Sequence, residues 1–187
     1  MNFVQPIRDP NTLLEIEKYL EQKSERNYVM FEIGINTGLR ISDILKLRVR
    51  TVRGSHIRLR ETKTAKQKSI LINNRLRKIL DRFIQDRDDD EFLIQSRQGV
   101  NKPIGRSMAY KILQEVAKHF GLEDIGTHTL RKTFGYHYYR QTKDLAMLMY
   151  IFNHASERIT LRYIGIIQDT VDRSMRNFNP TREGRSA

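Results

Sequence analysis

The sequence predicts a mainly α-helical α+β fold with a small three-stranded antiparallel sheet, and three observations support this class. Apolar residues recur at helical spacing over most of the chain. The stretch "HIRLRE" instead alternates apolar and basic residues, as a half-buried strand does. No internal repeat or obvious interdomain linker divides the 187 residues, so we expect one domain with a sizeable core.

The N-terminal segment predicts two helices and a short third one. The first begins at Asp9, a favourable cap, followed by Pro10 at the first helical position. The second, "RNYVMFEIGINTG", ends at Thr37-Gly38, because glycine commonly terminates helices. "SDILKL" then predicts a short helix capped by Ser42.

The predicted sheet follows these helices. Its first strand covers Val49 to Val52 and leads into a turn at Arg53-Gly54-Ser55. "HIRLRE" is the second strand, with Ile57 and Leu59 on one face and basic residues on the other. The turn "TKTAKQ" leads to the third strand, "SILI". Short turns between consecutive strands predict an antiparallel meander.

The rest of the chain is predicted to be helical. "NNRLRKILDRFIQDR" is amphipathic, and the acidic run from Asp86 to Glu91 after it is expected to be a solvated loop. "SMAYKILQEVAKHFG" predicts a helix capped by Ser107 and closed by Gly121. Four further helices are expected to begin near Thr127 or His128, at Asp144, at Ser156 and at Asp169, the last of them ending near Asn177.

The composition favours some classes of function and excludes others. The 34 Lys and Arg residues outnumber the 22 Asp and Glu residues, which gives a net charge of +12. Because the basic residues recur all along the chain, they indicate a nucleic acid partner. The absence of cysteine excludes disulfides, thiolate catalysis and cysteine-based zinc sites. Without an apolar run that could cross a bilayer or an apolar signal region, we expect a cytoplasmic protein.

Polar residues gather at predicted element boundaries rather than in the middle of helix or strand faces. His128 and Arg131 are three residues apart, so a helix places them on one face. Each such residue alone is typical of a surface charge, a helix cap or a core position. Their joint occurrence in this order predicts a functional site made of Arg40, Lys63, His128, Arg131, His154 and Tyr163.

With these spacings, the sequence resembles the catalytic domain of the tyrosine recombinases, also called phage integrases. The family's boxes are represented here by "TGLRISD", "TKTAKQKSILI", "HTLR", "FNHAS" and "TLRYIG". They contain the six residues named above, and Asp43 stands at the family's acidic position. The resemblance runs from about Leu13 to about Phe178 and implies the family's fold.

The resemblance implies phosphoryl transfer on double-stranded DNA in a bacterial or phage-derived protein, with no metal ion or cofactor. Arg40 and Arg131 would bind the non-bridging phosphate oxygens, because a guanidinium is a planar fork of donors that stays charged. His128 and His154 would donate further hydrogen bonds to the same oxygens.

Tyr163 is the nucleophile that the resemblance implies, and its attack would give a 3′-phosphotyrosyl link. Its unperturbed pKa is near 10, so a base must help it lose its proton, and His128 is the candidate. Lys63, on a hairpin, would protonate the leaving 5′ oxygen. Asp43 would orient a neighbouring catalytic group.

The sequence departs from the family's pattern at two places and in one expected feature of its domain organisation. Phe152-Asn153 replaces the usual Leu-Gly before His154, and Gly165 replaces a common histidine. We expect residues 1–178 to form the catalytic domain without the usual N-terminal core-binding domain, and 179–187 to be a flexible tail. The chain is then either a fragment of a longer integrase or a small stand-alone member.

The family's assembly and two other functions give further expectations. Members work as tetramers on DNA and pass a C-terminal segment to a neighbour. Here the segment after Gly165 could do this or pack on its own core, and the free protein could be a monomer. The boxes favour a recombinase, while a type IB topoisomerase-like activity and a non-catalytic DNA-binding remnant are the alternatives.

Overall fold

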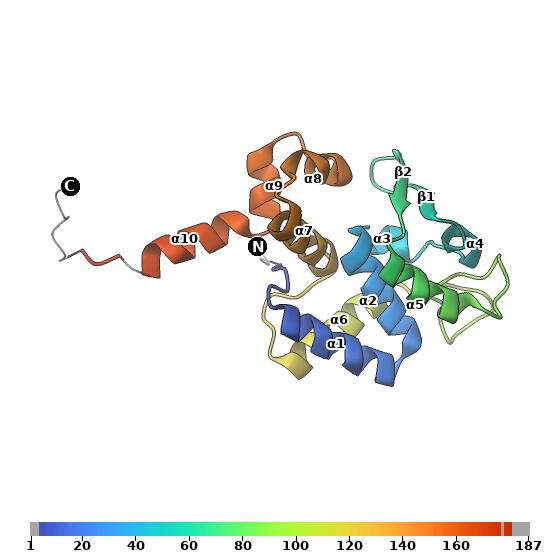
Figure 1. The fold of residues 1–187 in the computed structure, drawn as a ribbon. Helices are drawn as coiled ribbons and strands as arrows, with labels where there is room; N and C mark the ends of the chain where they lie inside the picture. Colours follow the sequence, from blue (N-terminus) through green and yellow to red (C-terminus); the bar gives the residue numbers. More distant parts are fainter. Residues whose placement is uncertain (1–3, 177, 181–187) are drawn as a thin grey trace.

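The protein is described by a computed structural model that covers residues 4–176 and 178–180. Within these residues the chain forms ten helices and a two-stranded antiparallel sheet. The helices α1, α2, α5 and α6 lie together at one end of the molecule, and α7, α8 and α9 at the other (Figure 1). The mainly helical class is therefore confirmed.

The larger core surrounds α2 (Glu25–Thr37), which is apolar on most sides. The helices α1 (Pro10–Lys23), α5 (Asn74–Ile84) and α6 (Arg106–Phe120) belong to the same core. Asp9 caps α1 as predicted, because its carboxylate accepts the Asn11 and Thr12 N–H groups. The left-handed φ of 63° at Gly38 ends α2, as the sequence predicts.

The sheet contains two strands among the described residues, so the prediction of three is wrong. Strand β1 (His56–Arg60) pairs with β2 (Gln67–Leu71), with His56 opposite Leu71. Val49–Val52, the expected first strand, is the short helix α4. A helical turn buries both Val49 and Val52, whereas the alternation of a strand would place them on opposite faces. The Val49 N–H bonds the carbonyl of Glu91 instead of a neighbouring strand.

Two predicted caps and one helix start also differ. Helix α3 (Ile41–Ile44) begins after Arg40, and α6 begins after Gly105, so Ser42 and Ser107 lie inside the first turns. Helix α10 (Ile166–Arg176) begins before the expected Asp169, and Asn177 lies outside the described residues.

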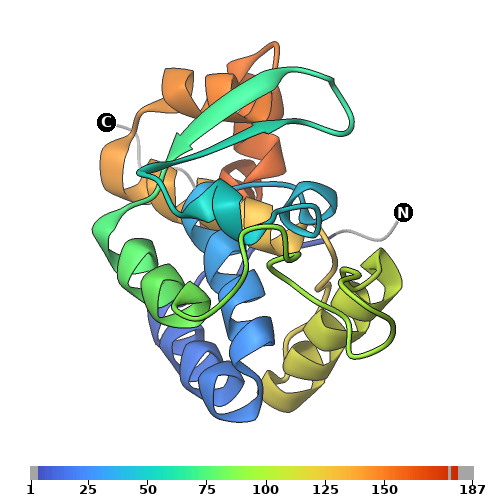
Figure 2. The same ribbon diagram turned by 90° about the vertical axis from the view of Figure 1, so that its right-hand side faces the viewer.

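A smaller core joins the three helices at the other end. Helix α7 (Thr129–Thr142) packs against α2 and continues into α8 (Leu145–Phe152) and α9 (Glu157–Tyr163). Asp144 and Ser156 cap α8 and α9, as predicted. Figure 2 shows the β hairpin extending across this end of the molecule.

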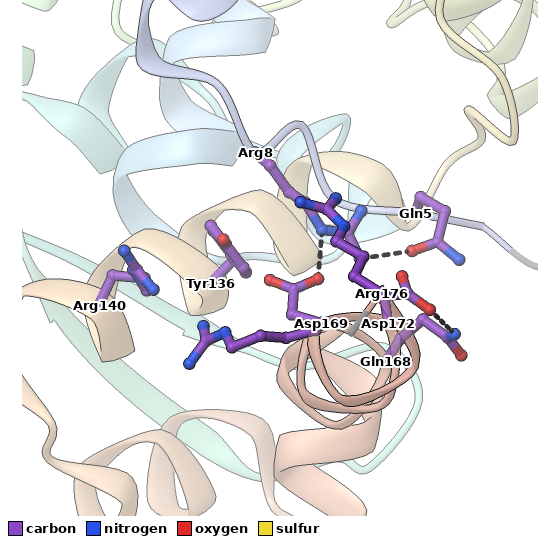
Figure 3. Close-up of a pocket in the computed structure, with 9 residues that line it drawn as sticks. Gln5, Arg8, Tyr136, Arg140, Gln168, Asp169, Asp172 and Arg176 are labelled. Carbon is purple, nitrogen blue, oxygen red and sulfur yellow. Dashed lines mark hydrogen bonds and ion pairs between the residues drawn. The ribbon is translucent and has the colours of Figure 1, made fainter. Parts of the chain in front are cut away.

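Helix α10 projects away from the body and contains no buried residue (Figure 1). Its base is held by the N-terminal segment, where Arg8 Nε donates to Asp169 Oδ1 over 2.7 Å (Figure 3). Gly165, with φ of 88°, precedes the helix and lies against Pro6 and Arg8. The predicted tail, 179–187, lies largely outside the described residues.

Candidate active site

The sequence-predicted site residues come from separate segments that meet between the α7–α9 group and the hairpin. Arg40 follows α2, and His128 and Arg131 lie at the start of α7. His154 lies in the α8–α9 turn and Tyr163 ends α9. Their charges and rings interact across these segments, as the contacts below show. Residues far apart in the sequence therefore form one basic cluster.

Arg131 is buried within this cluster and is held by several contacts. It is 3% exposed, and its guanidinium lies 4.4 Å from the centre of the Phe152 ring. Its Nη1 donates to the Gly38 carbonyl, and Nη2 donates to the Phe152 carbonyl over 3.3 Å. Because two carbonyls and a ring fix it, this cation cannot swing out to solvent. Its remaining donors are preorganised for an anion.

Arg40 lies beside Arg131 and is held differently. Its Nη1 donates to Oε1 of Glu61 over 2.6 Å. The Arg40 side chain is 16% exposed, whereas the Glu61 side chain is 0% exposed. The charges of Arg131 and Arg40 both act on Tyr163, where they oppose the rise in pKa that burial causes. The pair thus creates the positive field that a phosphate needs.

Tyr163 and His128 are in direct contact. Nδ1 of His128 lies 3.2 Å from the Tyr163 hydroxyl. Burial raises the pKa of the Tyr163 phenol, while the charges of Arg131 and Arg40 oppose the rise. Partial burial of the imidazole, with the charge of Arg131 as the next cause, lowers the pKa of His128. A neutral histidine beside a phenol that holds its proton has the arrangement of a base and a latent nucleophile.

His154 lies on the other side of the tyrosine. Its ring centre is 5.1 Å from that of Tyr163, and its Nδ1 lies 3.1 Å from the Thr160 hydroxyl. Burial, followed by the charge of Arg131, lowers the pKa of His154. The hydroxyl contact fixes the ring, so Nε2 is the nitrogen left to meet a ligand.

Lys63 is exposed in the turn between β1 and β2. Its ammonium donates no hydrogen bond to another side chain or carbonyl within the described part of the chain. It lies close enough to His128 for its charge to lower the pKa of that histidine. Asp43 anchors the same turn, since its Oδ1 accepts the Thr62 N–H over 2.9 Å. The structure thus places Asp43 beneath the hairpin turn.

Sequence reasoning missed four polar residues of this region. Lys132 lies with its ammonium 5.1 Å from the centre of the Tyr163 ring. Glu61, Lys68 and Asn153 form a hydrogen-bonded group beside Arg40. One signal for Glu61 was available: it directly follows β1 and continues the alternation of Ile57 and Leu59, so its side chain is expected on the same inward side.

The described residues provide neither a metal site nor a membrane-spanning helix. No group of three or more His, Asp or Glu side chains there is arranged to hold a metal ion. The described helices include none that is both long and apolar enough to cross a membrane. Three acidic residues of the run after α5 form ion pairs with arginines: Asp90 with Arg50, Asp89 with Arg53 and Glu91 with Arg87.

Comparison with known proteins adds a second line of argument. Residues 8–168 match the phage integrase family. The probable integrase/recombinase YoeC of Bacillus subtilis is 48% identical over 179 residues, which cover 95% of this chain and 98% of YoeC.

Two solved recombinase structures share the fold. The XerA recombinase has a TM-score of 0.71 at 20% identity, over 96% of this chain and 65% of XerA. The XerH recombinase, in a post-cleavage complex with its palindromic difH substrate, has a TM-score of 0.68 at 17% identity. That match covers 94% of this chain and 54% of XerH. The chain therefore spans less than two thirds of either structure.

Proposed function

Because the chain belongs to the phage integrase family, we propose that it is a site-specific DNA recombinase that cleaves and rejoins strands through a 3′-phosphotyrosyl intermediate. Its fold is that of the tyrosine recombinase catalytic domains. The observation that carries the proposal is the contact between the Tyr163 hydroxyl and His128 beside two partly or fully buried arginines.

The arginines supply charge where the reaction creates it. A phosphodiester gains negative charge on its non-bridging oxygens as a fifth oxygen approaches phosphorus. Arg131 is fixed before any substrate arrives, and Arg40 is held by Glu61. Preorganised donors in a partly buried pocket stabilise such charge without reorganising. His154 would donate a further hydrogen bond to the same oxygens.

Proton transfer would use groups on both sides of the phosphate. The Tyr163 oxygen forms the new bond to phosphorus, and its proton passes to His128, 3.2 Å away. The bond from phosphorus to the 5′ oxygen breaks, and that oxygen takes a proton from Lys63 in the hairpin turn. Asp43, through the Thr62 N–H, would hold the turn so that Lys63 can reach. The reverse steps rejoin the strand.

The partner in this proposal is double-stranded DNA, with a tetramer assembling on it and a monomer when free. The net charge of +12 supports the first part. Helix α10 supports the second, because it extends from the body with Val171 49% and Met175 60% exposed. An apolar face of this kind is suited to packing on a neighbouring protomer.

The first test asks whether Tyr163 becomes linked to DNA. Wild-type protein and Tyr163→Phe are incubated at low salt with a pool of nicked DNA duplexes of randomised sequence. A nick lets the product strand diffuse away and traps the adduct. We expect a covalent adduct from wild type and none from Tyr163→Phe, which should still bind DNA. Denaturing gels and sequencing of the trapped strands provide the measurement.

Tyr110→Phe is the matched control for that test. Tyr110 lies on α6, away from the candidate site, and is 44% exposed, so its variant should form the adduct at the wild-type level. An adduct with Tyr163→Phe would overturn the nucleophile assignment, and no adduct with wild type would support the non-catalytic alternative. Plasmid relaxation measured beside recombination of two recovered sites separates a topoisomerase from a recombinase.

A further inference from the structure

Glu61 is a buried carboxylate that no step of the proposed reaction uses. It follows β1, and its side chain is 0% exposed. Its oxygens accept from Arg40 over 2.6 Å, Thr64 over 2.5 Å and Asn153 over 2.8 Å, and they lie 3.1 Å from the Lys68 ammonium. A buried charge with this many donors is fully compensated.

The four donors belong to different segments of the site. Arg40 follows α2, Thr64 lies in the hairpin turn, and Lys68 lies on β2. Asn153 belongs to the α8–α9 turn, directly before His154. The carboxylate therefore connects the phosphate-binding arginine, the hairpin that carries Lys63 and the turn that carries His154. Lys68 strengthens the connection by donating to the Ile151 carbonyl at the end of α8.

The charge balance keeps this carboxylate ionised. Burial alone would raise the pKa of Glu61. Hydrogen bonds from Thr64 and Lys68, with the charges of Lys68 and Arg40, outweigh burial and hold the pKa below its usual value. Lys68 is in turn half-buried against the carboxylate. An anion of constant charge thus lies beside Arg40.

The Asn153 contact gives a physical reason for an unusual residue in this turn. Asn153 has a φ of 55°, in the left-handed region that favours glycine and that asparagine tolerates. Its side chain reaches across to Glu61, a contact that glycine could not make. The residue thus meets the backbone requirement and also joins the turn to the hairpin.

We propose that Glu61 is a positioning residue for strand cleavage, acting through Arg40 and, with Asn153, through the turn that bears His154. This inference rests on the proposed function, because it concerns the same reaction. An opposite role can be drawn from the same contact, in which Glu61 occupies Arg40 and competes with the phosphate. The two roles predict opposite changes in the cleavage rate.

The test measures single-turnover cleavage by the full chain on a nicked duplex recovered from the trapping pool. Glu61→Gln keeps the size of the side chain and removes its charge. We expect its cleavage rate at saturating protein to fall by about 10- to 100-fold, as for other groups that orient a reacting one. Its DNA affinity should change by less than about threefold, because most phosphate contacts lie elsewhere.

The pH profile separates positioning from a general loss of structure. Removing the anion leaves the charge of Arg40 unbalanced near Tyr163, which favours the phenolate. The rise of the Glu61→Gln cleavage rate with pH should therefore shift to lower pH, although the maximum falls. A merely structural defect would lower the rate without moving the profile.

Asn153→Gly is the second variant, and it keeps the test valid if Glu61→Gln folds poorly. Glycine suits the left-handed φ, so the change removes only the hydrogen bond to Glu61. We expect a fall of only a few-fold, because Arg40, Thr64 and Lys68 still hold Glu61 in this variant. Glu115→Gln, at an exposed ion pair with Lys23, is the control and should cleave like wild type.

The outcomes distinguish this inference from the function on which it rests. If wild type forms no adduct, the proposed function fails. If wild type forms the adduct and both Glu61→Gln and Asn153→Gly cleave at its rate, the positioning role alone is overturned. Faster cleavage by Glu61→Gln would also overturn it and would assign the competing role.

Discussion

At the scale of single residues, burial and nearby charges act in opposite directions on the pKa of Tyr163. Burial raises the pKa of Tyr163, and the arginines lower it, so the phenol stays protonated without a phosphate yet lies in a field that favours its anion. His128 has a lowered pKa and is the neutral acceptor at neutral pH. A protonated phenol and a neutral imidazole are thereby held together, as the proposed roles of nucleophile and base require.

A prediction about Lys63 tests whether this residue donates the proton that the leaving 5′ oxygen receives. An alcohol leaving group needs an acid, whereas a thiol, with a pKa near 8.5, leaves without one. We expect Lys63→Ala to slow cleavage of ordinary DNA by about 10²- to 10⁴-fold. The loss should be much smaller on DNA whose scissile 5′ oxygen is replaced by sulfur. Single-turnover cleavage of both substrates at saturating protein measures the difference.

Lys18→Ala is the control, because Lys18 is also an exposed lysine and lies on α1, away from the hairpin. It should cleave both substrates at nearly the wild-type rate. Equal losses for Lys63→Ala on the oxygen and sulfur substrates would contradict a role as the acid.

The six candidate site residues and Asp43 were predicted from the sequence because each stands in a short box of fixed spacing. Glu61, Lys68 and Asn153 could not be predicted, because the sequence does not show how the hairpin packs on the α8–α9 turn. Only the tertiary arrangement brings Glu61 to Asn153, 92 positions away. The alternation of β1 indicated an inward Glu61 without naming its partners.

At the scale of elements, a buried acidic pair joins α1, α2 and α5. Glu32 on α2 is fully buried and interacts with Glu17 on α1 and with Arg75 on α5. Burial, followed by the charge of Glu17, raises the pKa of Glu32 to about 8, although Arg75 opposes the rise. Folding therefore protonates this carboxyl over most of the physiological pH range.

The contribution of Glu32 to the free energy of unfolding therefore falls as pH rises from its ordinary pKa of 4.5 to about 8. Between the ordinary pKa of Glu32 and about 8, the unfolded chain is ionised at this position while the folded chain keeps the proton. Glu32→Gln removes this titration. At pH 8 we expect it to raise the free energy of unfolding by roughly 1–3 kcal/mol relative to its effect at pH 5. Denaturant unfolding from pH 5 to 9 measures the change.

Glu115→Gln again provides the control, since Glu115 is exposed and should leave the pH dependence of unfolding unchanged. An unchanged slope in Glu32→Gln would show that Glu32 ionises normally in the folded protein.

Most elements could be predicted, and the errors have local causes. Asp9, Gly38, Asp144 and Ser156 mark helix ends correctly because caps and left-handed residues act through local backbone groups. The run Val49–Val52 was misassigned because four residues rich in valine favour a strand by propensity. Its burial and its hydrogen bonds to the 89–91 loop depend on tertiary structure, and they favour a helix instead.

At the scale of the whole molecule, the net charge of +12 gives a prediction about DNA affinity. Each phosphate that a basic residue neutralises releases condensed counterions, so the logarithm of affinity falls linearly with the logarithm of salt concentration. With Tyr163→Phe, which is expected to form no adduct, we expect a slope of about −4 or steeper, corresponding to roughly five or more phosphate contacts. Fluorescence anisotropy over a salt series measures it.

Two lysines show which face produces that slope. Lys66 lies beside His154 in the cavity between the hairpin and α8, so in the Tyr163→Phe background Lys66→Ala should make the slope shallower by about one. Lys18 is exposed on α1, at the opposite end of the molecule (Figure 1). Lys18→Ala should leave the slope unchanged. If the two variants alter it equally, the affinity reflects overall charge, and the face that carries the candidate site is not the DNA-binding surface.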